Sequence, residues 1–375
     1  MSPNTFLNIN NGERDRTALF GEWEAHVNSK WTTLAGVRYE YVKTNAQDVN
    51  GYANVNSTGT GSMTMYSYQL RDSDAFNAQD HKKTDNNWDV TALSRYIANA
   101  NTDIEFGFAR KVRSPNLYER YTWSTWQMAA LMNNTVGDGN GYLGDVNLKS
   151  EKAHTVSATL DWHAANRDWA LKATPYFTYV NDYIDAVQWD ATPPAARTTS
   201  VANNVYTTLR YVNQSARLYG LDVSGYMPLA QNSVGQFAVK GLLNYTHGEN
   251  RATGDNLYNI MPLNGKITLT HNYQAWDNAV ELVMVKDKDR TSDARNEIQT
   301  KGYSLLNLRS SYNWKQARLD LAVENLFDKQ YALPLGGAYL GQGNTMSLNP
   351  TSPLGWGTAV PGMGRSVNVG LTLKY

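Results

Sequence analysis

The connections between predicted strands constrain the fold more than any other feature of this sequence, because they alternate strictly between short and long. Apolar and polar side chains alternate within segments of about a dozen residues, and each such segment ends in turn-forming residues. We predict strands at residues 15–28, 31–43, 86–99, 103–113, 152–163, 169–184, 205–227, 236–248, 262–275, 277–287, 301–313, 317–327 and 364–375. Every second connection is long, as at 44–85, 114–151 and 328–363, so an up-and-down antiparallel sheet would carry all its long loops at one end.

The last strand shows the alternation of faces most clearly. In the sequence GRSVNVGLTLKY, one face of an extended chain carries Val367, Val369, Leu371, Leu373 and Tyr375. Polar residues and glycine occupy the other face. The strand therefore separates an apolar medium from a polar one.

Soluble β-sandwiches and propellers also alternate, but two observations favour a membrane barrel. The strands are about twice the usual five or six residues, and a membrane strand needs roughly 9 to 11. Five tryptophans cluster beside the short turns, as a membrane interface selects: Trp31, Trp162, Trp169, Trp276 and Trp314. No stretch approaches the roughly 18 apolar residues of a membrane helix. The sequence thus predicts an all-β transmembrane barrel, integral to a bacterial outer membrane, with lipid outside and a polar lumen.

Composition and motifs argue against several functions. Lys plus Arg equals Asp plus Glu at 34 each, so nothing in the charge indicates nucleic acid as a partner. No cysteine is present, which excludes thiolate chemistry within the chain. The six histidines lack zinc-ligand spacing, and no serine lies in a nucleophile-elbow sequence. We therefore do not expect an enzyme.

The strand count is odd, whereas bacterial single-chain barrels have an even number. The amino terminus, MSPNTFLNINNGERDR, also has neither the basic start nor the apolar core of a secretory signal. We therefore expect residues 1–375 to be the carboxyl-terminal part of a longer barrel. The alternative is a miscounted strand, for which 205–227 is the longest candidate.

Three segments resemble TonB-dependent outer-membrane receptors: VENLFDKQYALPLGG (323–337), FARKVRSPNLYERYTW (108–123) and GYLGDVNLKSEKAH (141–154), although Ser150 stands where that family usually has proline. The resemblance implies a 22-stranded barrel, of which the thirteen strands are the last, and an amino-terminal plug domain that is absent here. It also implies partners. These are the TonB–ExbB–ExbD complex, reached through a missing amino-terminal region with its TonB box, and the barrel-insertion machinery, which would read the terminal strand Val367–Tyr375.

Within that family, TDNNWDVTALSRY, RYVNQSARLYGLDVSG and TGDNLYNIMPLN are similar to the copper receptors of Gram-negative outer membranes. This resemblance implies a receptor for copper uptake, with the copper ion as transported ligand. Without a plug, the chain is not expected to transport copper alone.

Methionines in the long loops agree with copper as the ligand, because thioethers suit Cu(I). Six lie there: Met63, Met65, Met128, Met132, Met346 and Met363. An M-x-M or a helical M-x-x-x-M could present two sulfurs to one ion, so we take Met63, Met65, Met128 and Met132 as candidate metal ligands. His81 and His154 border the same loops and complete the candidate set. The alternative is that loop methionines are adaptable packing residues.

Two other functions stay open. A siderophore or haem receptor of the same family would use aromatic and basic residues at the loop apex, here Arg113, Tyr118, Arg120, Tyr121, Trp123 and Trp126. An outer-membrane pore or barrel enzyme is the alternative from another class. The enzyme predicts a Ser–His arrangement, and none has usable spacing.

Overall fold

The computed structural model describes residues 7–51, 63–125, 127–189, 208–339 and 358–373, with only the backbone of 63–68 and 127–128. Thirteen long strands lie side by side in chain order, and all neighbouring pairs are antiparallel. They are β1 (Asn10–His26), β2 (Trp31–Gln47), β3 (Lys83–Asn99), β4 (Thr102–Arg113), β6 (Glu151–His163), β7 (Ala170–Gln188), β8 (Thr208–Asn232), β9 (Gly235–Asn250), β10 (Asn264–Tyr273), β11 (Trp276–Val285), β12 (Tyr303–Asn313), β13 (Ala317–Glu324) and β16 (Ser366–Leu373). Each overlaps one predicted strand, so the prediction of an all-β up-and-down sheet is confirmed.

Apolar side chains line the outer face of this sheet in register across strands. Trp23 lies opposite Ala35, Ala35 opposite Ala92, and Ala92 opposite Phe108. In β16, the side chains of Val367, Val369, Leu371 and Leu373 are 56–68% exposed. This confirms the outer face predicted for β16, except at Tyr375, which lies outside the described residues.

The inner face carries ion pairs instead. Arg95 on β3 forms an ion pair with Asp103 on β4. On β11, Glu281 forms ion pairs with Arg309 at 3.5 Å and with Lys266 at 3.9 Å. Charged groups that pair with one another are typical of a barrel lumen. The polar medium predicted from the alternation is therefore the lumen.

Aromatic rings mark the end of the sheet where the strands are joined by short turns. The rings of Trp162 and Trp169 lie 4.8 Å apart on either side of the β6–β7 turn. Trp276 contacts Tyr312 at 4.8 Å, and Tyr312 contacts Trp314 at 4.6 Å. The predicted tryptophan belt is therefore present, and it marks one membrane interface.

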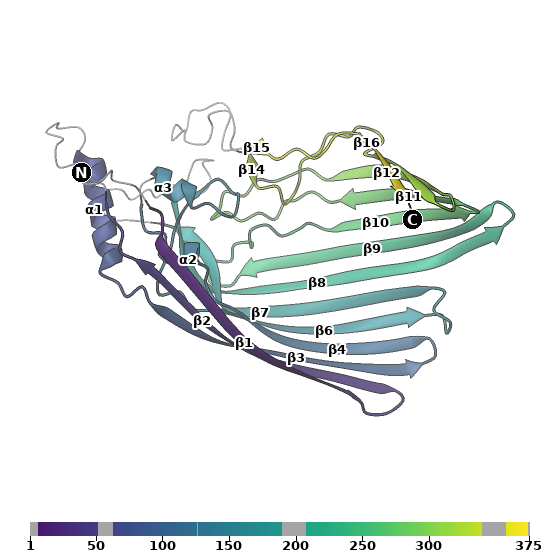
Figure 1. Ribbon diagram of the computed structural model, residues 1–375, viewed down its shortest axis with the longest axis horizontal. Helices are drawn as coiled ribbons and strands as arrows, with labels where there is room; N and C mark the ends of the chain where they lie inside the picture. Colours follow the sequence, from purple (N-terminus) through teal and green to yellow (C-terminus); the bar gives the residue numbers. More distant parts are fainter. Residues whose placement is uncertain (1–6, 52–62, 126, 190–207, 340–357, 374–375) are drawn as a thin grey trace.

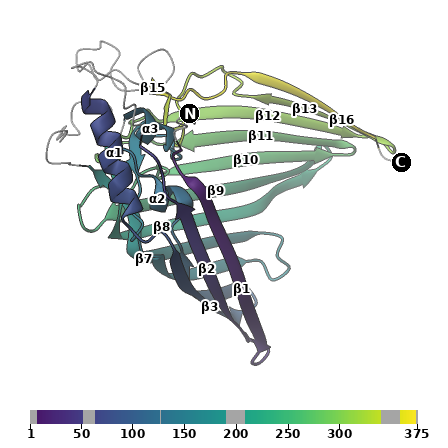
Figure 2. The same ribbon diagram turned by 60° about the vertical axis from the view of Figure 1, so that its left-hand side comes forward.

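The thirteen strands form an open, curled sheet. Figures 1 and 2 show β1 and β16 at separate edges of a trough, and in the described part of the chain each has a single neighbour. The odd number of strands therefore does not close through a parallel pair between β1 and β16 in this structure.

Folded loops gather at the end of the sheet opposite the tryptophan belt (Figure 1). They contain α1 (Met63–Asn77), α2 (Leu117–Tyr121), α3 (Gln127–Met132), β5 (Gly141–Leu143), β14 (Ala338–Tyr339) and β15 (Thr358–Ala359). Among the described helices, none is long and apolar enough to span a membrane.

β7 runs further toward the loops than its predicted range, whereas the extra length of β8 lies at the end with the short turns. A bulge between Val180 and Tyr183 bends β7, and Asp182 takes a positive φ of 55° there. Beyond the bulge, β5 adds to β8 in parallel, with Gly141 opposite Thr208. The extra length of β7 therefore lies in the loop layer, where buried side chains replace lipid.

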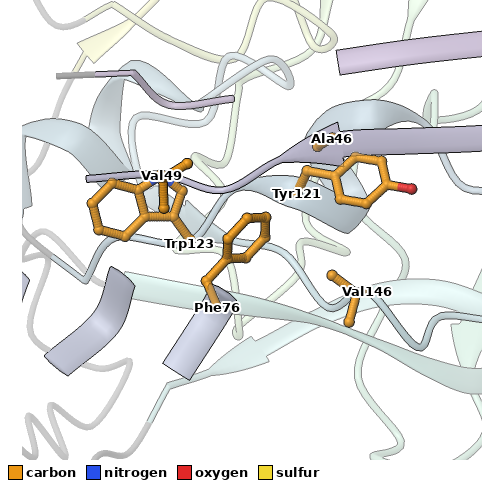
Figure 3. Close-up of a cluster of buried hydrophobic side chains, with 6 residues drawn as sticks. All are labelled: Ala46, Val49, Phe76, Tyr121, Trp123 and Val146. Carbon is orange, nitrogen blue, oxygen red and sulfur yellow. The ribbon is translucent and has the colours of Figure 1, made fainter. Parts of the chain in front are cut away.

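A small apolar core holds this loop layer together. It contains Ala46, Val49, Phe76, Tyr121, Trp123 and Val146, which come from β2, α1, α2 and the loops between them (Figure 3). The Tyr121 hydroxyl donates to the His81 carbonyl oxygen at 2.7 Å and also bonds Thr44 at 2.8 Å. The layer thus has a core like that of a soluble domain.

Candidate functional site

α3 carries the predicted M-x-x-x-M pair at the loop end of the sheet. Met128 and Met132 are four residues apart on its backbone, so the two positions share one helical face. The Met132 side chain is 64% exposed. The segment is helical, as the M-x-x-x-M argument requires, while the binding of a metal by these two residues stays a prediction.

The M-x-M pair, Met63 and Met65, lies on a helix rather than on an extended strand. They lie in the first turn of α1, where helix positions two residues apart do not share a face. An M-x-M pair presents two sulfurs together on an extended strand, and α1 is not extended. The spacing therefore gives no helical argument for a shared ion.

A polar contact joins α1 to the segment that leads into α3. The buried carboxylate of Asp72 accepts from the Thr125 amide at 2.8 Å and from its hydroxyl at 2.5 Å, and Arg71 pairs with the same carboxylate at 2.6 Å. Met65 precedes Asp72 by seven residues, about 10 Å along a helix axis. Both methionine-bearing helices therefore belong to one layer, with their methionines at separate places in it.

His81 lies in the loop core. Its Nδ1 is 3.1 Å from the Ala46 carbonyl oxygen, its Nε2 is 2.8 Å from the Phe76 carbonyl oxygen, and its ring stacks on Phe76. Both ring nitrogens thus face backbone acceptors. In this arrangement His81 is a structural residue, because backbone carbonyl groups lie at both of its ring nitrogens.

His154 lies on the outer wall. Strand alternation in β6 puts it on the same face as Val156, Leu160 and Trp162, which are exposed to the surroundings of the barrel. It therefore does not join the methionines above the lumen. Of the remaining loop methionines, Met363 is exposed beside β16, and Met346 lies outside the described residues.

In the part of the chain that the structure describes, no three His, Asp or Glu residues come together as a possible metal site. Clusters of this kind hold ions that prefer oxygen and imidazole ligands. A metal held by thioethers does not need such a cluster.

The aromatic and basic loop apex proposed for a chelate is mostly buried. Arg120 pairs with Asp85 at 2.8 Å and donates to Thr44, while Arg113 pairs with Glu119 and Glu151. Tyr121 and Trp123 belong to the loop core, and Trp126 lies outside the described residues. Among the described members, Tyr118 is 41% exposed and the Arg113 side chain is 45% exposed, but Arg120, Tyr121 and Trp123 are buried. The prediction that these residues form one open surface was wrong, because their charges and rings are satisfied within the loop layer.

A buried polar network around Arg295 was not predicted. Its guanidinium bonds Asp185 on β7 at 3.0 Å, lies 3.8 Å from Asp138, and stacks 5.5 Å from the Tyr142 ring centroid. Burial raises the pKa of Tyr142 and of Tyr258, so both hydroxyls stay protonated. The network joins three loops that are far apart in sequence. Asp138 comes from the segment GDGNG (137–141), where Gly137 and Gly139 have φ of 79° and 82°.

These features together define the wall of an outer-membrane β-barrel. The strands have an apolar outer face and a polar inner face, tryptophans lie at the short turns, and folded loops lie at the other end. Within that class, the chain belongs to the TonB dependent receptor-like β-barrel family, whose model matches residues 1–326. This is a family of outer-membrane receptors rather than enzymes.

Sequence relatives include two proteins of Haemophilus influenzae strains, both named Heme/hemopexin utilization protein C. One is 24% identical over 274 residues, covering 67% of this chain and 36% of the relative. The other is 25% identical over 252 residues, covering 61% and 32%. The chain spans about a third of the length of these curated relatives.

Solved structures share the fold at low identity. The Copper transporter OprC has a TM-score of 0.69 and 18% identity, over 96% of this chain and 49% of that protein. The FrpB iron transporter from Neisseria meningitidis has a TM-score of 0.61 and 14% identity, over 97% and 46%. The siderophore receptor PiuA from Acinetobacter baumannii has a TM-score of 0.59 and 16% identity, over 97% and 44%. These likenesses concern the fold alone.

Proposed function

We propose that residues 1–375 form the carboxyl-terminal wall and loops of a 22-stranded TonB-dependent receptor that takes up copper. The loops would capture the ion, and the TonB–ExbB–ExbD complex would supply energy for its passage. Copper is the transported substrate in this proposal, not a resident cofactor.

The observation that carries the proposal is the helical methionine pair on α3. Met128 and Met132 lie one turn apart in the loop layer, and Met132 is open to solvent. Thioethers are soft ligands that favour Cu(I), and the chain has no cysteine to compete with them. Met63 and Met65 are kept as a second, weaker pair. His81 and His154 are left out because one faces two backbone carbonyls and the other lies on the outer wall.

The burial of the aromatic and basic apex supports a small ion over a large chelate. A chelate needs exposed rings and cations, and Arg113 and Arg120 are already paired with carboxylates. A single soft ion needs only two or three sulfurs at the surface. The shared fold with a copper transporter agrees with the proposal but does not carry it.

The test is Cu(I) binding by the detergent-solubilised chain in competition with a chromogenic chelator. Mutation of residues that only hydrogen-bond to metal ligands typically lowers metal affinity roughly 10–100-fold. Loss of two direct ligands in M128L/M132L should therefore lower Cu(I) affinity at least tenfold. The control is M227L/M284L, which changes two methionines on the wall strands β8 and β11 instead of in the loops. Equal affinity in both double variants would refute the proposed site.

A haem or siderophore receptor is the second candidate. The observation that favours it is the match of 67% of this chain to a relative named for haem use. Hemin and a ferric catecholate should then quench the intrinsic tryptophan fluorescence, and neither M128L/M132L nor added Cu(I) should change that binding. Saturable hemin binding without Cu(I) binding would replace copper by haem.

A further inference from the structure

Four polar side chains form a straight row across the outer wall, near the loops. Arg110 on β4 lies opposite His154 on β6, His154 lies opposite Tyr179 on β7, and Tyr179 lies opposite Arg217 on β8. Directly opposed residues in antiparallel strands are about 5 Å apart, so the row extends roughly 15 Å. The register therefore brings together residues that are more than a hundred positions apart in the chain.

The row lies at the upper edge of the lipid-facing surface. The next outward residues toward the turns are Phe108, Val156, Phe177 and Tyr219, again in direct register and 38–52% exposed. One row is thus aromatic and aliphatic, and the adjacent row is cationic and hydrogen-bonding. Such a change over two residues marks the boundary between acyl chains and head groups in the leaflet beside the loops.

Cations outnumber carboxylates around this row. Arg217 pairs with Glu249 at 2.7 Å, but Arg251 pairs with the same carboxylate at 2.8 Å. Arg110 donates to the Trp88 backbone carbonyl oxygen, and Arg290 donates to the Tyr245 hydroxyl at 3.0 Å. Among the described residues, neither Arg110 nor Arg290 has an ion-pair partner. The patch therefore has positive charge left for an anion from outside.

We propose that the row Arg110–His154–Tyr179–Arg217 binds the phosphate groups of a lipid in the leaflet beside the loops. Arginine guanidinium groups bind phosphate through paired N–H donors, and the Tyr179 hydroxyl supplies another donor. The apolar row beneath takes the acyl chains of the same molecule. A free phosphate ion would use the first row only, whereas a lipid uses both. This inference depends on the outer-membrane location of the barrel and not on copper as substrate.

The experiment is native mass spectrometry of the detergent-solubilised chain with diphosphoryl lipid A or with zwitterionic phosphatidylcholine as probe. Lipid A should remain bound to the wild type, and its apparent affinity should fall at least tenfold in R110Q/R217Q. The matched control is R309Q, which removes a charge from the lumen face instead. Heat-modifiable mobility on gels shows that each variant is folded.

A second variant separates the lipid site from general electrostatics. F108S/F177S keeps every charge and removes two rings of the apolar row, so lipid A affinity should fall while inorganic pyrophosphate remains a poor competitor. Unchanged lipid A binding in R110Q/R217Q, an equal loss in R309Q, or displacement of lipid A by pyrophosphate in stoichiometric amounts would each overturn the proposal.

Discussion

Replacing Arg295 by alanine should open the loop layer without unfolding the wall. The guanidinium is buried against Asp185 and Asp138, and its removal leaves two carboxylates without their cation. Breaking a buried pair in this way costs about 3–5 kcal/mol. Each carboxylate keeps another partner, since the Asn250 side-chain amide donates to Asp185 at 2.7 Å and the Asn140 backbone amide donates to Asp138 at 3.0 Å. We therefore expect the lower end, about 3 kcal/mol.

That free energy corresponds to a roughly hundredfold larger population of opened loops, at 1.36 kcal/mol for each factor of ten. Limited proteolysis reports this population when opening and closing are fast relative to cleavage. Cleavage within the loops of R295A should accordingly be about a hundred times faster than in the wild type, while the strands stay protected. R309A, which breaks a half-exposed ion pair on the lumen wall, should leave loop cleavage unchanged.

A rescue variant tests the reason for the effect. R295M/D185N removes the cation together with one stranded carboxylate, so its loops should be more resistant than those of R295A. If R295A loops are cleaved at the wild-type rate, the network does not hold the loops, and the reasoning from buried charge fails.

Three further predictions follow from the wall and the loop core. V369R places a cation on the lipid face of β16 and should destabilise the folded barrel by about 2–4 kcal/mol in urea titrations, whereas N368R on the lumen face should have little effect. F76A removes the largest apolar ring that α1 contributes to the loop core, so loop cleavage should rise as expected for a loss of about 3–5 kcal/mol, with unchanged strand protection. Burial raises the pKa of Tyr142. The neutral hydroxyl therefore stabilises the fold fully below the unfolded pKa near 10, and this stabilisation is lost progressively as the pH rises toward the raised pKa of the folded state. Loop cleavage should accordingly increase about tenfold per pH unit above 10 in the wild type and less in Y142F.

The wall could be predicted from the sequence because two media select its residues. In β4, Ile104, Phe106 and Phe108 face lipid while Glu105 faces the lumen, and this alternation is visible without any knowledge of the neighbouring strands. The same rule could have placed His154, since it shares its parity with Val156. We grouped it with the loop methionines on sequence distance alone, and strand parity was the better guide.

The loop layer could not be predicted in the same way, because its stability comes from pairs that are distant in sequence. Arg120 meets Asp85, and the Tyr121 hydroxyl meets Thr44, more than thirty and seventy positions away. From the local sequence alone, an arginine that is buried in an ion pair cannot be distinguished from an arginine that stays exposed and binds a ligand. The proposed chelate surface failed for this reason, and Arg295 was missed for the same one.

This difference also limits what fold similarity can say about the transported ligand. The wall is shaped by lipid and lumen water, which are common to all receptors of this class, so proteins named for copper, iron and siderophores align over nearly the whole chain at 14–18% identity. We expect selectivity to come from the loop layer, where ion pairs and burial already engage Arg113, Arg120, Arg295 and Tyr121. Two exposed groups on the described loops, Met132 on α3 and Tyr118 on α2, differ in the ligand that they favour. A soft ion would need the first and a planar chelate the second, so M128L/M132L and Y118A measured side by side against Cu(I) and hemin should separate the two functions.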